Sequence, residues 1–178
     1  MNILLGVTGS VAAIRTPRLI EAISSIHNLQ VVTTKAALHF WDETMRSIPV
    51  WKDTDEFPNK RYSRGDVVLH IELRKWADAL VIAPLTAHTL ARLSHGFSDD
   101  LLTSVVRAWE RDKPIIIAPA MNTEMWNHPA TKEHLDTLNR WYRITMVNPI
   151  SKRLACGDEG VGGIADMADI VAALPSLI

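Results

Sequence analysis

Short apolar runs rich in β-branched residues alternate along this chain with stretches of helical periodicity. Runs that end at a turn residue are typical of buried parallel strands, and they occupy Asn2–Val7, Leu29–Thr34, Ala77–Pro84, Lys113–Pro119 and Arg143–Pro149. Between them, apolar residues recur at helical spacing, as in 100–112 and 133–142. Strands that alternate with helices predict an α/β fold in which helices cover both faces of a parallel sheet.

Three segments depart from this regular alternation. The predicted first helix contains Pro17, which we expect to kink it. Residues 48–66 show no periodicity and predict a loop, whose length suggests a functional role. Residues 151–165 include Gly157, Gly160, Gly162 and Gly163, which predict a mobile flap. With 178 residues and no internal repeat, the chain is expected to form a single domain spanning residues 1–178.

Charge and composition exclude several functional classes. The formal net charge is −1 and the basic residues are scattered, which argues against nucleic acid and anionic membranes as partners. The longest uncharged run, Met1–Ile14, is shorter than the roughly 20 apolar residues of a membrane span, and it lacks the basic start of a signal peptide. Cys156 is the single cysteine, which fits a reducing compartment, so a cytoplasmic protein is expected.

Polar residues gather where three predicted strands end. The stretches "VTGSVAA", "APLTAHT" and "APAMNTEMW" should converge, because ligands of such sheets bind at the carboxyl ends of the strands. Backbone N–H groups of Gly9 and Ser10 can face an anion at a helix start, although the same pattern fits a plain tight turn. The spacing matches neither a dinucleotide fingerprint nor a P-loop, and it allows a mononucleotide phosphate. The hydroxyls of Thr33 and Thr34 fit either caps or ligands.

Two further side chains are candidates for chemistry. His70 lies between Leu69 and Ile71, where it is either a structural side chain or an acid/base group. Cys156 lies in the glycine-rich segment after Arg153, where its thiol could reach a ligand. The histidines have neither His-x-x-x-His spacing nor a partner cysteine cluster, so no metal site is predicted.

Several motifs together resemble the phosphopantothenoylcysteine decarboxylases, a family of homo-oligomeric flavin-containing cysteine decarboxylases. The motifs are "GVTGSVAA", "VLHIELRKWAD", "APLTAHTLARLSHGFSDDLLT", "APAMNTEMW" and "LACGDEGVG", in that order, and they extend over almost the whole chain. The resemblance implies a flavodoxin-like (Rossmann-like) three-layer fold that binds FMN, assembled as a trimer with sites at the subunit interfaces.

The resemblance also implies a role for individual residues. His70 and Cys156 would be catalytic, and the substrate would be bound by Asn122, Arg153, Ala155 and Ile164. The cofactor would be held by Gly9, Ser10, Val11, Thr33, Thr34, Lys35, Thr86, Ala87, His88, Thr89 and Ala120. Asn122 would donate hydrogen bonds to the carboxylate that leaves as CO₂.

The implied reaction converts 4′-phosphopantothenoylcysteine to 4′-phosphopantetheine in coenzyme A biosynthesis. The substrate thiol is oxidised to a thioaldehyde, CO₂ is lost, and the enethiol that remains is reduced with a proton from Cys156. His70 would be the acid/base residue of the first half. The electron sink has to come from the cofactor, because the side chains offer none.

The chain departs from the family pattern at a few positions, and other functions remain open. His88 stands where relatives commonly have Asn, Ser98-Asp99-Asp100 where they often have Cys-Asp-Asn, and Ile164 where they often have Met. One alternative is a decarboxylase of C-terminal cysteines in peptides. Another is a regulatory subunit of the same fold, such as a phosphatase inhibitor or a mixed-trimer partner, although the chain has no long extra tail and retains His70 and Cys156. Flavin prenyl transfer is disfavoured by the Pro-Ala-Met-Asn motif.

Overall fold

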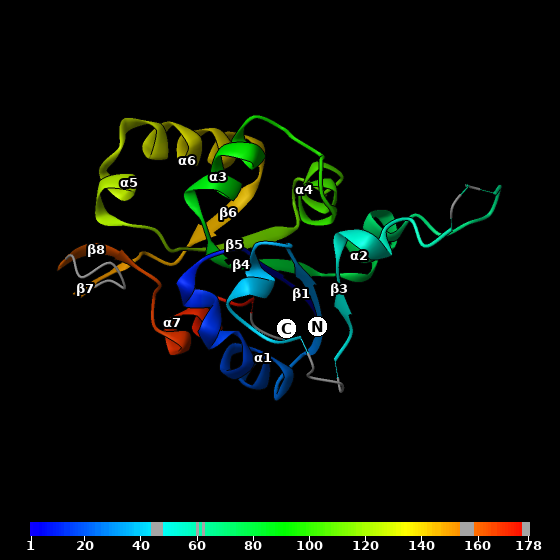
Figure 1. Ribbon diagram of the computed structural model, residues 1–178, viewed down its shortest axis with the longest axis horizontal. Coiled ribbons are helices and arrows are strands. Elements are labelled where there is room, and N and C mark those ends of the chain that lie inside the picture. Colours follow the sequence, from blue (N-terminus) through cyan, green and yellow to red (C-terminus); the bar gives the residue numbers. More distant parts are fainter. Residues whose placement is uncertain (44–47, 60, 62, 154–158, 176–178) are drawn as a thin grey trace.

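The computed structural model describes residues 1–43, 48–59, 61, 63–153 and 159–175, without the side chains of 152, 153 and 159. Within them the main sheet has six strands, all parallel, in the spatial order β3-β2-β1-β4-β5-β6 (Figure 1). The strands are β1 (Asn2–Val7), β2 (Asn28–Thr33), β3 (Val50–Trp51), β4 (Ala79–Leu85), β5 (Pro114–Pro119) and β6 (Arg143–Met146). The predicted parallel α/β fold is confirmed.

The long strands match the sequence prediction, and the edge strand β3 does not. Each of the five predicted runs forms a strand, and these five have the order of flavodoxin-like sheets, in which the second strand lies at one edge beside the first. β3 pairs with β2 inside the segment expected to be a loop. That expectation is wrong at Val50–Trp51, because a strand of two residues has no periodicity to detect.

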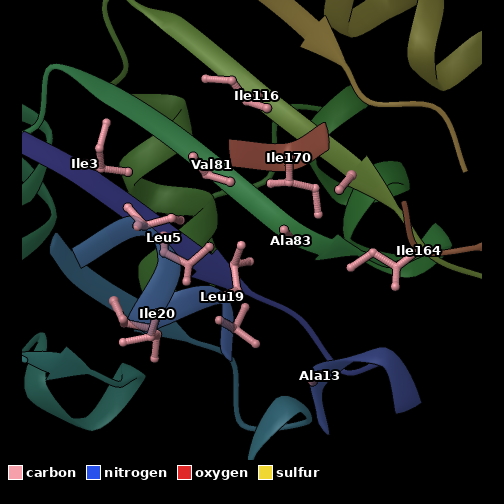
Figure 2. Packing of buried hydrophobic residues seen from close by; sticks show 14 of the residues in the cluster. Ile3, Leu5, Ala13, Leu19, Ile20, Val81, Ala83, Ile116, Ile164 and Ile170 are labelled. Carbon is pink, nitrogen blue, oxygen red and sulfur yellow. The ribbon is translucent and has the colours of Figure 1, made fainter. Parts of the chain in front are cut away.

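Side chains alternate between two apolar layers, one on each face of the sheet. Ile3 and Leu5 of β1 point toward α1 (Thr16–Ser24) and α7 (Met167–Ala172), which lie on one face (Figure 2). Leu4 and its counterparts point to the other face, where they meet the helices α2 (Leu69–Trp76), α3 (Ala87–Ser94), α4 (Leu101–Arg107) and α6 (Pro129–Trp141). Period-two alternation therefore places helices on both sides of the sheet, as Figure 1 shows.

The first predicted helix is two helices. A 3-10 helix, η1 (Val11–Arg15), follows β1, and α1 starts anew at Thr16. Pro17 occupies the first turn of α1, where its missing N–H leaves no hydrogen bond unmade. The expected kink at Pro17 is therefore wrong, since the residue starts a helix rather than bending one.

Smaller elements complete the chain. The 3-10 helices η2 (Ala37–His39) and η3 (Asp53–Asp55) follow β2 and β3, and α5 (Thr123–Asn127) follows β5. An antiparallel hairpin of β7 (Ile150–Arg153) and β8 (Glu159–Gly163) occupies the segment expected to be a flap. No helix in the described part of the chain is long and apolar enough to cross a membrane.

The contact between β1 and α4 gives a test of the core. A Cβ added at Gly6 would lie 2.8 Å from the Cδ1 atom of the fully buried Leu102. We expect Leu102→Ala to lower the free energy of unfolding by about 2–5 kcal/mol, through lost burial and the cavity left behind. Gly6→Ala should cost less in the Leu102→Ala background than in the original chain, because the new methyl group then has room. Urea unfolding at fixed protein concentration measures the free energy of unfolding of the single and double variants. If the losses of the two single variants simply add in the double variant, this packing is contradicted.

Candidate active site

A cleft of about 470 Å³ opens at the carboxyl ends of β1, β2, β4 and β5. The connection after β1 runs to α1 on one face of the sheet, and the connection after β4 runs to α3 on the other. The cleft therefore lies at the topological switch point, where sheets of this kind bind ligands. Its lining residues are Gly9, Ser10, Thr34, Lys35, Ala36, Asp53, Thr86, Ala87, His88, Thr89, Arg92, Asp100, Ala120, Met121 and Met125.

The hydroxyl of Thr8 joins the two strands at the switch point. Thr8 is fully buried; its Oγ1 donates to the carbonyl of Pro84 at 2.7 Å and accepts from the backbone N–H of Thr86 at 3.0 Å. One side chain thus satisfies a donor and an acceptor at the end of β4. The bridge fixes the loop after β1 relative to the start of α3, and so it fixes the distance between the two walls of the cleft.

The loop after β1 packs tightly against the loop after β2. A Cβ at Gly9 would lie 2.5 Å from the Cβ of Ala36, so only glycine allows this approach. Ser10 caps η1, because its Oγ accepts from the backbone N–H of Ala12 at 3.2 Å. Val11, named with these residues in the sequence analysis, is 46% exposed and does not line the cleft.

The two threonines at the end of β2 face different environments. Thr34 lines the cleft, and its Oγ1 accepts from the N–H of Ala37 at 3.3 Å. Thr33 is fully buried, and its Oγ1 accepts from the indole N–H of Trp41 at 3.2 Å. Lys35, the next residue, is exposed on the rim of the cleft. Of the residues expected after β2, Thr34 and Lys35 reach the cleft and Thr33 belongs to the interior.

The start of α3 forms the opposite wall. Thr86 caps this helix, with its Oγ1 accepting from the N–H of Thr89 at 3.2 Å. Ala87 and His88 follow in the first turn, and all four side chains line the cleft. Ala120 approaches from β5, where its N–H donates to the carbonyl of Leu85 at 2.9 Å. The predicted convergence of these strand ends is confirmed.

Charged residues at one end of the cleft were not identified as site residues from the sequence. Arg92 donates to Asp100 at 2.6 Å and also pairs with Asp99. Asp53 accepts from the N–H of Leu101 at 3.0 Å, and burial raises the pKa of its carboxyl above the ordinary value. Asp53 lies in the segment without periodicity, so only its acidic character could have drawn attention to it.

Asn122 is the N-cap of α5, just beyond the cleft residue Met121. Its Oδ1 accepts from the backbone N–H of Glu124 at 2.8 Å, which orients the amide group. The hairpin lies directly alongside, because the N–H of Met121 donates to the carbonyl of Gly162 at 2.9 Å. Gly162 has φ 144°, and a Cβ there would lie 2.3 Å from the carbonyl oxygen of Met121. Glycine at this position lets β8 and the Asn122 loop meet backbone to backbone.

The remaining predicted substrate residues are distributed differently. Ile164 is 5% exposed and packs in the apolar layer with Leu19 and Ile170 (Figure 2), so its side chain is in the core and does not line the cleft. Arg153 ends β7, where its backbone pairs with Glu159. Ala155 and Cys156 lie outside the described residues, and the side chain of Arg153 is not described either.

His70 occupies the first turn of α2, away from Asn122. Its Nδ1 lies 2.5 Å from Oε1 of Glu56, and it does not line the cleft. In Figure 1, α2 is on the opposite side of the molecule from α5 and the β7–β8 hairpin. Within the described residues, no cluster of His, Cys, Asp and Glu could hold a metal ion.

The Thr8 bridge gives a second test. Thr8→Val keeps the shape of the side chain but leaves the Thr86 N–H and the Pro84 carbonyl without their partner, so we expect it to lower the free energy of unfolding by about 1–3 kcal/mol. Thr8→Ser is the matched control, because it retains the hydroxyl. Urea unfolding of the two variants should separate them clearly. Equal midpoints for serine and valine would show that the bridge contributes nothing.

Comparison with known proteins identifies the family. A model of the family described as Flavoprotein matches residues 1–178. The phosphopantothenoylcysteine decarboxylase of Oryza sativa subsp. japonica is 51% identical over 167 residues, which cover 93% of this chain and 75% of that protein. The enzyme of the same name from Mus musculus is 41% identical over 179 residues, which cover 99% of this chain and 87% of that protein.

Solved structures agree with this result. A mutant of PPC decarboxylase complexed with pantothenoylaminoethenethiol has a TM-score of 0.91 and 45% identity, and the match covers 96% of this chain and 94% of that one. The FMN binding protein AtHal3 has a TM-score of 0.88 and 46% identity, with 96% and 92% covered. The chain therefore belongs to the flavoprotein family, among the phosphopantothenoylcysteine decarboxylases.

Proposed function

We propose that this protein is an FMN-dependent decarboxylase that converts 4′-phosphopantothenoylcysteine to 4′-phosphopantetheine in coenzyme A biosynthesis. The observation that carries the proposal is the match to decarboxylases over nearly the whole chain, at 51% identity to the rice protein. The family model matches residues 1–178, a range that includes the cleft, the Asn122 loop and the hairpin beside it.

The residues of the cleft fit FMN. Its volume of about 470 Å³ falls in the range of cofactor pockets, about 300–1,000 Å³. Hydroxyls of Ser10, Thr34 and Thr86 and the ammonium of Lys35 offer partners for a phosphate and a ribityl chain. Apolar side chains can cover a planar ring, and these are Ala87, Ala120, Met121 and Met125. When bound, FMN supplies an acceptor for the electron pair of the substrate and later returns it, so the reaction has no net redox change.

Asn122 is proposed to bind the substrate carboxylate. The hydrogen bond from Glu124 N–H to its Oδ1 determines which end of the amide is the acceptor, and the Nδ2 hydrogens are then the donors for an anion. A carboxylate held by an amide is fixed in geometry without a formal charge pair, which favours its departure as neutral CO₂.

His70, Arg153, Ala155 and Cys156 are proposed to complete the site. His70 takes and returns a proton during oxidation of the thiol and loss of CO₂. Arg153 and Ala155 bind the substrate. Cys156 delivers the proton that completes the aminothiol product. The hairpin base beside Asn122 supports this assignment, because it brings the segment to the carboxylate end of the cleft.

We further propose a homotrimer in which each site is shared between subunits, in the cytoplasm. The arrangement of the elements supports this, because α2, which contains His70, lies on the opposite side of the molecule from α5, whose N-cap is Asn122 (Figure 1). Exposed apolar side chains offer contact area for a second copy, and they include Val11, Ile14, Phe57, Val67, Phe97 and Met125. A single cysteine fits a reducing compartment.

The first test is a mass-spectrometric assay with 4′-phosphopantothenoylcysteine. We expect the purified protein to carry FMN and to remove the mass of CO₂ from the substrate. His70→Asn and Asn122→Asp should retain FMN and lose turnover by at least about 10²-fold, because each removes a group that acts on the substrate. FMN without loss of CO₂ in the unmodified protein would indicate a different cysteinyl substrate, as in peptides. No FMN and no loss of CO₂ would favour a regulatory subunit.

A second test concerns the shared site. Co-expression of the inactive His70→Asn and Asn122→Asp variants should restore activity, because mixed trimers contain sites with an intact residue from each chain. Random mixing in a symmetric ring predicts about a quarter of the normal activity. Each variant expressed alone provides the control. If both residues act within one chain, the mixture stays as inactive as its components.

A further inference from the structure

A buried glutamate contacts the candidate acid/base residue. Glu56 follows η3 and is 7% exposed, although it carries an ionisable group. Its Oε2 accepts from the backbone N–H of His70 at 3.1 Å, and its Oε1 lies 2.5 Å from Nδ1 of the same residue. Within the described residues, His70 is the partner of both carboxylate oxygens.

Two different functions are combined in this pair of contacts. The bond from the His70 N–H caps the start of α2, which a neutral acceptor could do equally well. The contact with Nδ1 has no role in capping. A carboxylate placed at one imidazole nitrogen accepts a hydrogen bond from its N–H, and this determines which ring nitrogen carries the proton.

We propose that Glu56 is a positioning residue that holds the ring of His70 with its proton on Nδ1 and leaves Nε2 as the reacting atom. The proposal rests on the acid/base role of His70 given above. An ionised carboxylate can only accept, so Nδ1 must be the donor of this hydrogen bond. The neutral ring then has its lone pair on Nε2, for which the described residues offer no hydrogen-bond partner. His70 is a quarter exposed at its side chain, so that nitrogen can reach a substrate.

Other groups around the glutamate do not replace this role. Lys52, the N-cap of η3, is paired with Glu43 at 2.5 Å. The burial of a carboxylate is costly unless its oxygens are hydrogen-bonded, and here both hydrogen bonds go to one histidine. The arrangement is the same in principle as the carboxylate that orients the histidine of a serine protease.

Glu56→Gln tests the proposal because it retains the size and one acceptor. The glutamine oxygen can still cap α2, but its NH₂ group can only donate to Nδ1, which moves the ring proton to Nε2. We expect kcat to fall by at least about 10²-fold with little change in KM, and FMN content and thermal midpoint to stay close to those of the unmodified protein. Glu56→Asp keeps an acceptor-only group and should recover part of the loss.

Glu110→Gln is the matched control. Glu110 binds Arg74 of the same helix α2 at 2.5 Å, without touching His70. If kcat depended only on the general anchoring of α2, Glu110→Gln would lower it as much as Glu56→Gln. We expect Glu110→Gln to retain kcat, and equal losses in the two variants would overturn the proposal.

A spectroscopic measurement separates this inference from the proposed function. In ¹⁵N-histidine-labelled protein, long-range ¹H–¹⁵N spectra at alkaline pH distinguish the two neutral forms of the ring, and His70→Asn identifies the signal. We expect the form with the proton on Nδ1 in the unmodified protein and the other form in Glu56→Gln. If the unmodified protein has no decarboxylase activity, the proposed function fails while this spectrum still decides the role of Glu56. A proton on Nε2 in the unmodified protein, or unchanged kcat in Glu56→Gln, refutes the proposal.

Discussion

The hydroxyl of Thr8 links the end of β1 to the end of β4, and the geometry of the candidate site depends on this link. A parallel sheet whose connections leave to opposite faces opens a crevice at its switch point, and nothing in strand pairing alone fixes the width of that crevice. Thr8 spans it with one donated and one accepted hydrogen bond. The walls of the cleft, from the turn after β1 to the cap of α3, take their relative positions from this bridge and from the contact between Gly9 and Ala36.

Much of the fold was predictable because a parallel strand that is buried on both faces has a continuous apolar sequence. Runs of β-branched residues such as Ile115–Ile117 indicate strands buried on both faces, and the alternation of such strands with helices indicates a parallel sheet. β3 was missed because two residues cannot display a period. The kink expected at Pro17 was wrong for a different reason: sequence gives the rigidity of proline but not whether a helix starts there.

The site was predictable in outline and less so in detail. Gly, Ser and Thr residues at the strand ends identified the cleft. The sequence could not distinguish Thr33 from Thr34, because consecutive side chains point to opposite sides, one into the interior and the next into the cleft. Asp53 and Glu56 belong to a segment without periodicity, and their partners Leu101 and His70 are remote in the sequence. Long-range hydrogen bonds of this kind follow from the packing of loops, which local propensity does not encode.

Two of the three glycines of β8 have a consequence for attempts to change the substrate of this protein. A Cβ at Gly160 would be 2.5 Å from the hydroxyl oxygen of Thr123, and one at Gly162 would be 2.3 Å from the carbonyl oxygen of Met121. The hairpin base and the Asn122 loop are therefore packed so closely that neither glycine has room for a side chain. A side chain introduced at either glycine would displace the Asn122 loop, which we propose binds the substrate carboxylate, along with the hairpin. Side chains on the wall formed by α3, such as His88, meet the open cleft and have room to change, but we propose that this wall holds FMN, so exchanges there would alter cofactor binding.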